Sequence, residues 1–84
     1  MNGTLVVNIL GWLGVAALLG AYALISAGKV KGDSVPYQLM NLGGSACVLL
    51  NSLRFGAYPS VGVNAVWMVI ALLALLKAFR PPRI

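Results

Sequence analysis

The sequence predicts an all-α membrane protein, and three observations carry this prediction. Three apolar runs, Leu5–Ala27, Val35–Leu53 and Ser60–Phe79, are each close to the roughly 20 residues that a bilayer-spanning helix needs. The connections between them are short, and the chain is 61% hydrophobic and only 8% charged. The sequence also lacks the ten-residue alternating segments of a membrane barrel. We therefore expect one domain, residues 1–84, that folds as a bundle of three transmembrane helices.

The first two runs have helix-boundary signals at their ends. Thr4 is a suitable N-cap for the first helix, and Gly28 followed by Lys29 is typical of a helix C-terminus. Ser34 lies two residues before Pro36, which suits the first turn of a second helix.

Prolines bound the third run. Residues 55–59, which end in Pro59, are expected to form the second turn, so that Ser60 starts the third helix. This helix must stop before Pro81-Pro82, because no helix continues through two consecutive prolines.

The charges are distributed unevenly. The net charge is +5, but every basic residue flanks an apolar run, which is typical of a topology signal and argues against nucleic-acid binding. Three spans bring the first loop and the C-terminal tail to the same side, and together these hold five of the six basic residues. The expected orientation is N-terminus outside and C-terminus in the cytoplasm, with lipid headgroups as neighbours. The five residues are Lys29, Lys31, Lys77, Arg80 and Arg83, and the sixth is Arg54.

The chain is poor in groups that carry chemistry. It has no histidine, one carboxylate side chain (Asp33) and one cysteine (Cys47). A metal cluster, a carboxylate pair or a Ser-His-Asp triad therefore cannot form within one chain, and we expect no enzymatic activity, no metal and no cofactor.

The second run contains a polar stripe. At 100° per residue, Gln38, Asn41, Ser45 and Ser52 fall within about 60° of one another on a helix. An amide or hydroxyl that faced lipid would be left unpaired at a cost in free energy, so the stripe should face other helices or a wet cavity. Interhelical hydrogen bonding and cavity lining are both open interpretations.

On one face of the third run, a polar pair is followed by a row of small residues. Asn64 and Trp67 are one helical turn apart, and an amide beside an indole suits a polar organic solute. The alternative is that Asn64 caps or links helices and that Trp67 fills the bundle. The whole face consists of Ser60, Asn64, Trp67, Ala71, Ala74 and Ala78.

The first run has a ridge of small residues. Gly11, Gly14, Ala17 and Ala21 lie on one face and would allow a second helix to approach closely. The Gly43-Gly44 pair is expected either to receive such a ridge or to mark a hinge.

The chain resembles the SemiSWEET proteins of the PQ-loop superfamily, which are bacterial half-transporters that dimerise to carry sugars. The resemblance is best over residues 34–64, where Ser34, Gly44, Pro59 and Asn64 align with recurring family positions without a gap. It implies a three-helix, multi-pass protein of the bacterial inner membrane, in which Asn64 lines the solute pocket.

The chain also departs from that family. The Pro-Gln pair of the first span is missing, with Tyr22-Ala23-Leu24 in that region, and Val48 stands where a pocket tryptophan is expected. A group of small, uncharacterised bacterial membrane proteins related to the PQ-loop fold is the nearer likeness. Its pattern here comprises Tyr37-Gln38, Asn41, Gly43-Gly44-Ser45, Pro59-Ser60, Asn64 and Trp67.

The expected function is a small-solute transporter or facilitator that acts as a parallel homodimer. Three helices cannot enclose a solute path and still pack, whereas two copies with the same orientation give six helices around a central site. The alternative is a non-catalytic accessory subunit of a larger respiratory or photosynthetic membrane complex. The predicted solute-binding residues are Asn64, Trp67, Gln38, Asn41 and Ser45.

Overall fold

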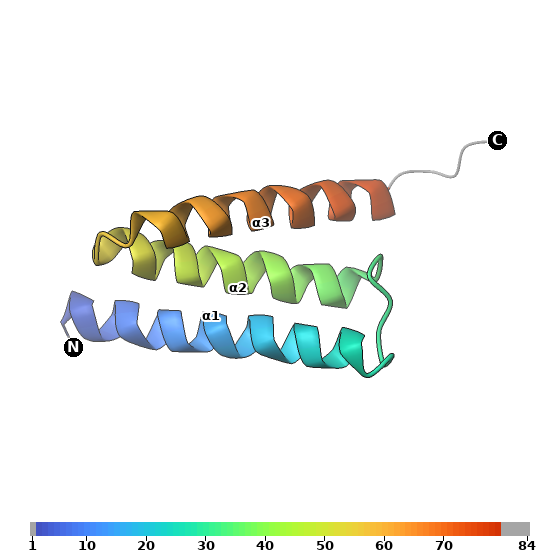
Figure 1. Ribbon diagram of the computed structural model, residues 1–84, viewed down its shortest axis with the longest axis horizontal. Coiled ribbons are helices and arrows are strands. Elements are labelled where there is room, and N and C mark those ends of the chain that lie inside the picture. Colours follow the sequence, from blue (N-terminus) through green and yellow to red (C-terminus); the bar gives the residue numbers. More distant parts are fainter. Residues whose placement is uncertain (1, 80–84) are drawn as a thin grey trace.

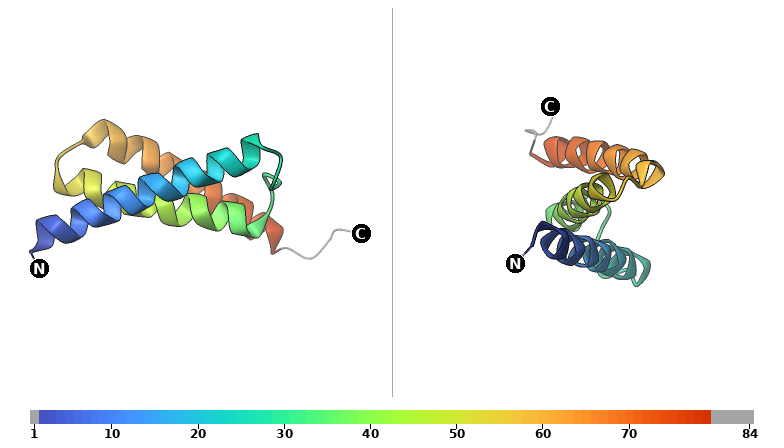
Figure 2. Two further views of the ribbon diagram at one scale, coloured as in Figure 1. Left: turned by 90° about the horizontal axis from the view of Figure 1, so that it is seen from below. Right: turned by 90° about the vertical axis from the view of Figure 1, so that its left-hand side faces the viewer.

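Three helices in one layer form the fold (Figure 1). The computed structural model describes residues 2–79, which contain α1 (Gly3–Ser26), α2 (Val35–Arg54) and α3 (Tyr58–Ala78). Helix α2 lies in the middle and packs against both neighbours, whereas α1 and α3 have no packing interface with each other in this part of the chain (Figure 2). The prediction of an all-helical, up-down-up chain is confirmed.

The start of α1 differs from the prediction. Asn2, not Thr4, is the N-cap, and its Oδ1 accepts a hydrogen bond from the backbone N–H of Leu5 at 2.8 Å. Asparagine is a better N-cap than threonine, and the helix gains two residues, about half a turn, by starting there. Thr4 instead lies inside the helix, where its Oγ1 accepts a hydrogen bond from Nη2 of Arg54 at 2.9 Å. Thr4 thereby joins the beginning of α1 to the end of α2.

The start of α3 also differs from the prediction. The helix begins at Tyr58 rather than Ser60, because Pro59 fits the first turn, where no intrahelical N–H donor is needed. The start of α2 is as predicted: Ser34 is the N-cap, with its Oγ 3.4 Å from the Tyr37 nitrogen, and Pro36 lies in the first turn.

Two glycines end the first two helices in the same way. Gly28 and Gly56 have φ angles of 71° and 69°, a left-handed conformation that glycine adopts without steric cost. After α1, the N–H of Lys29 donates to the carbonyl of Leu24 at 2.9 Å, and after α2 the N–H of Ala57 donates to the carbonyl of Ser52 at 2.9 Å. Both ends are Schellman motifs, so the prediction that Gly28 terminates the first helix is confirmed.

The burial pattern is the reverse of that of a soluble protein. Among residues 2–79, the buried hydrophobic side chains are only Ala21, Ala71 and Leu75. Large apolar side chains such as Leu13 and Leu73 are exposed instead. The polar side chains that are buried are Asn41, Ser45, Ser52 and Asn64.

Two of the described helices, α1 and α3, are long and apolar enough to cross a membrane by length and composition. Helix α2 has a sufficient length of 20 residues, but its amides and hydroxyls make it less apolar than its neighbours. Its polar side chains are mainly those that the layer buries.

Glycine allows α1 and α2 to approach closely. Gly14 and Gly44 are both buried, and a Cβ atom built on Gly14 would lie 2.7 Å from the carbonyl oxygen of Gly44. Gly11 faces Asn51 in the same interface. The predicted small-residue ridge therefore receives Gly44, whereas Gly43 is exposed and has open space where its side chain would be.

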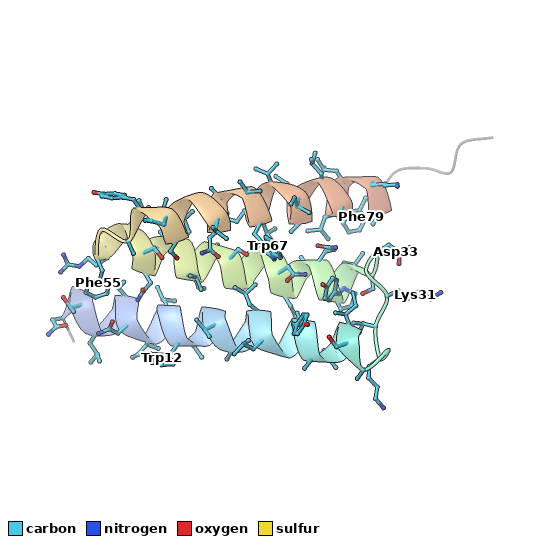
Figure 3. The ribbon with its side chains drawn as sticks, viewed as in Figure 1. Trp12, Lys31, Asp33, Phe55, Trp67 and Phe79 are labelled. Atoms are coloured by element: carbon cyan, nitrogen blue, oxygen red, sulfur yellow. The ribbon has the colours of Figure 1, made fainter. Side chains whose placement is uncertain are left out.

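The charged residues lie at the two ends of the layer. The first loop, with Lys31 and Asp33, is at the same end as Phe79 (Figure 3), and we call this the loop end. Arg54 lies at the opposite end, close to the N-terminus and the turn at residues 55–57, and we call this the turn end. The predicted grouping of Lys29, Lys31 and Lys77 is confirmed, and Arg80 and Arg83 lie outside the described residues.

The α1–α2 contact predicts opposite results for two glycine substitutions. Gly14→Ala should lower the free energy of unfolding by about 1–3 kcal/mol, because its Cβ would meet backbone that cannot move aside. Gly43→Ala, on the same helix as Gly44, should be neutral or slightly stabilising, because alanine favours a helix and meets no atom there. Denaturant unfolding followed by circular dichroism measures both. Equal effects of the two substitutions would contradict the close contact.

Candidate functional site

Helix α2 presents two different polar faces to its neighbours. Toward α1, Asn51 donates from Nδ2 to the backbone carbonyl of Val7 at 3.0 Å, alongside the glycine contact. Toward α3, Ser52 and Ser60 share a hydrogen bond of 2.7 Å between their hydroxyl oxygens. The face toward α3 includes Ser52 of the predicted polar stripe, whereas Asn51 lies outside that stripe.

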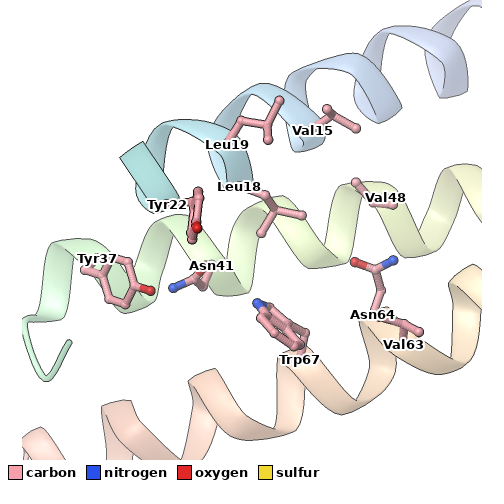
Figure 4. Close-up of a pocket in the computed structure, with 10 residues that line it drawn as sticks. All are labelled: Val15, Leu18, Leu19, Tyr22, Tyr37, Asn41, Val48, Val63, Asn64 and Trp67. Atoms are coloured by element: carbon pink, nitrogen blue, oxygen red, sulfur yellow. The ribbon is translucent and has the colours of Figure 1, made fainter. Parts of the chain in front are cut away.

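A groove of about 390 Å³ lies over α2, between α1 and α3. It is open along one side and exists because α1 and α3 each pack on α2 but not on each other. We call it the central groove, and Figure 4 shows its lining. The lining residues are Val15, Leu18, Leu19, Tyr22, Tyr37, Asn41, Val48, Val63, Asn64 and Trp67.

Asn64 presents a hydrogen-bond acceptor to this groove. Its Nδ2 donates to the backbone carbonyl of Ser60 at 2.8 Å and lies 3.3 Å from the Ser60 hydroxyl oxygen. A carbonyl can only accept, so this bond fixes the amide orientation and turns Oδ1 toward the groove. Figure 4 shows that oxygen on the side of Trp67. Because Ser60 also bonds to Ser52, the position of Asn64 is tied to both α2 and α3.

The other polar groups of the groove lie nearer the loop end. The indole nitrogen of Trp67 points toward Asn41, and the side chains of Tyr22 and Tyr37 flank Asn41 from α1 and α2 (Figure 4). Together these residues offer amide, indole and phenol groups beside aromatic surface. No charged side chain is among the described residues that line the groove, so it suits a neutral solute better than an ion, which would be left without a counter-charge.

Three of the five predicted site residues come together. Asn41, Asn64 and Trp67 all line the central groove although they come from two helices. Gln38 lines a smaller cavity of about 120 Å³ between α2 and α3, which Asn41 and Trp67 also line. Its Nε2 donates to the carbonyl of Gly32 at 2.7 Å, which anchors the first loop. Ser45 is fully buried, lines neither of these two cavities, and its hydroxyl has no hydrogen-bond partner within residues 2–79.

The residues of α1 that line the central groove were not predicted from the sequence. Val15, Leu18, Leu19 and Tyr22 follow one another at helical spacing, which is a signal for a common face. The signal is ambiguous, however, because all faces of this helix are apolar. Only the glycine contact with α2 determines that this face borders the groove.

The fold and the groove define a class: small, three-helix proteins with candidate membrane spans and an internal polar surface. The chain belongs to an uncharacterised protein family, whose model matches residues 7–83. No curated protein and no solved structure matches the chain.

The different surroundings of two buried serines predict opposite effects on stability. Ser45→Ala should leave the free energy of unfolding unchanged or raise it by about 1 kcal/mol, because it removes a buried hydroxyl that has no partner. Ser52→Ala should lower it by about 0.6 kcal/mol, because it breaks the hydrogen bond with Ser60. Both changes remove one oxygen from the same helix, so each is a control for the other in denaturant unfolding. A larger loss for Ser45→Ala than for Ser52→Ala would contradict these hydrogen-bond assignments.

Proposed function

We propose that all three helices cross a membrane and that the central groove is the binding site of a small-solute transporter or facilitator. Helices of 24, 20 and 21 residues are about 36, 30 and 32 Å long at 1.5 Å per residue. These lengths match a hydrocarbon core of about 30 Å. The exposed apolar side chains support the same proposal, since a surface of this kind is poorly compatible with water.

The transport proposal rests on one observation, which is that polar side chains line the central groove. Asn41, Trp67 and Asn64 line one groove, with Trp67 between the two amides (Figure 4), in a layer whose outer surface is apolar. In a membrane, these groups could not face lipid without leaving hydrogen bonds unmade. A second copy of the chain, in the same orientation, would cover the open side of the groove and place two sets of these groups around a shared central site.

The resemblance to SemiSWEET proteins supports the same function through Asn64, the position that lines the solute pocket in that family. The groove also contains Val48, which stands at the position of the family's pocket tryptophan. Trp67 supplies an indole from α3 instead. The solute we expect is small, polar and neutral, and facilitated diffusion is favoured because Asp33, the one carboxylate side chain, lies in the exposed first loop.

The proposed orientation puts the N-terminus and the turn end outside and the basic loop end in the cytoplasm. In a Cys47→Ala background, Tyr58→Cys should react with a membrane-impermeant thiol reagent added to whole cells. Lys31→Cys should react only after the membrane is permeabilised. Both positions are exposed, so a difference in reactivity reports topology and not burial. The opposite labelling pattern would reverse the orientation.

Transport is tested by solute flux into proteoliposomes. Stopped-flow light scattering with urea, glycerol and glucose as separate osmolytes should show faster entry of at least one solute than into protein-free liposomes. Asn64→Ala should reduce this flux about tenfold or more, because it removes the acceptor that the groove presents, at about 1.4 kcal/mol per factor of ten.

The matched control for Asn64→Ala is Leu73→Ala, a substitution on the exposed apolar side of the same helix. Its flux should equal that of the unmodified protein. Unchanged flux in Asn64→Ala would remove Asn64 from the site, and equal losses in both variants would indicate a general defect in folding.

A further inference from the structure

The amide of Asn41 has no hydrogen-bond partner within residues 2–79. Asn41 is only 8% exposed, and none of the side-chain hydrogen bonds in this part of the chain involves it. Asn51 and Asn64 differ, because each donates from Nδ2 to a backbone carbonyl. Burying an amide without a partner costs free energy, so Asn41 indicates a bonding partner that the described chain does not supply.

The Asn41 amide borders the central groove between two aromatic side chains. Tyr22 lies on its α1 side and Trp67 on its α3 side (Figure 4). Tyr37, about one turn earlier on α2, lines both the central groove and the smaller cavity, as do Asn41 and Trp67. The amide therefore lies where the two cavities meet and is flanked by aromatic surface from the two outer helices.

The Asn41 amide offers donors and an acceptor side by side. Its Nδ2 carries two N–H donors and its Oδ1 accepts. Since no group in the described chain holds either atom, the amide can turn to present both to one ligand, whereas Asn64 presents only its oxygen. Two hydrogen bonds then form with a ligand edge that has an N–H next to an acceptor, as asparagine pairs with the adjacent donor and acceptor of adenine.

The rest of the lining limits what else the ligand can carry. Beside its two asparagines, the central groove is lined by aliphatic and aromatic side chains in the described part of the chain. A solute with hydroxyl groups on all sides would leave several of them unpaired against this surface. A flat ring instead turns its apolar faces to the aromatic walls and keeps its polar groups on its edge. The groove volume of about 390 Å³ falls within the roughly 300–1,000 Å³ usual for small-molecule sites.

We propose that Asn41 binds a flat, neutral ring compound through an edge that has an N–H beside a C=O, and that Tyr22 and Trp67 contact the faces of the ring. This inference rests on the proposed function, because it takes the central groove as the solute site and names the class of solute. Unsaturated cyclic amides and imides belong to this class, and uracil is a convenient probe for it.

Tryptophan fluorescence tests this class of ligand directly. The chain has two tryptophans, so in a Trp12→Phe background the emission comes from Trp67 alone. Uracil added to the purified protein in lipid nanodiscs should quench this emission saturably. N,N′-dimethyluracil, which keeps the flat ring and both carbonyls but has no N–H, should bind at least about tenfold more weakly. Dihydrouracil, which keeps the edge but has a puckered ring, should bind about threefold more weakly because its contacts with the aromatic walls are poorer.

Three variants separate binding from folding. Asn41→Leu keeps the branched shape without the amide and should weaken uracil binding at least about tenfold, yet leave the free energy of unfolding unchanged or higher. Ser45→Ala, about one turn further along α2 and outside both cavities, should bind uracil like the parent protein. Trp67→Phe with Trp12 retained should show no saturable quenching, because Trp12 does not line the central groove.

Several results would overturn the proposal. Absence of saturable quenching by uracil, or equal binding of uracil and N,N′-dimethyluracil, would exclude the paired hydrogen bonds in the protein with an intact Asn41. Undiminished uracil binding in Asn41→Leu would remove this residue from the site. A large loss of stability in the same variant would show that the amide serves the fold instead.

The same measurements separate this inference from the proposed function. If glycerol or glucose enters proteoliposomes at a rate that depends on Asn64 but uracil does not bind, transport stands and the class of solute is wrong. If uracil binds through Asn41 but radiolabelled uracil enters proteoliposomes no faster than protein-free liposomes, the class of ligand stands and transport is wrong.

Discussion

Helix α2 has polar side chains on two of its faces and must bury both against helices that are mostly apolar. It does so by lying between them. On one side, glycine lets its backbone approach α1, and Asn51 reaches a backbone carbonyl of that helix. On the other side, Ser52 meets Ser60 of α3, which in turn holds Asn64. Because α2 separates its two neighbours, they do not touch, and the central groove is the space that remains.

The two interfaces of α2 differ in how closely the helices approach and in what holds them together. The glycine contact with α1 is close and leaves no room for a side chain, so it gives the groove a fixed wall at Gly14 and Val48. The contact with α3 depends on hydrogen bonds near the turn end and is less tightly packed near the loop end, where a cavity lies beside Gln38. An apolar exterior with buried polar side chains follows from this arrangement and supports the proposal that the chain crosses a membrane.

Much of this arrangement could be predicted from periodicity. The three helices follow from the apolar runs, and the shared face of Asn64 and Trp67 follows from their spacing, because both are local properties of the chain. The start of α1 was less predictable, since Asn2 and Thr4 are both acceptable N-caps. The structure uses Asn2, the stronger of the two. Ser45 shares its stripe with Asn41 but is fully buried, because the stripe is wider than the part of α2 that borders the groove.

We propose that two copies of the chain close the central groove, and native mass spectrometry from mild detergent measures this most directly. A closed pair should appear as a species of twice the 8.8 kDa chain mass. This species should dissociate when Leu19, on the open rim of the groove, is replaced by Lys and should persist when the outward-facing Leu73 is replaced in the same way. A chain that is recovered only as a monomer, or only together with the subunits of a larger complex, would contradict the claim. The second of these results would favour the role of an accessory subunit.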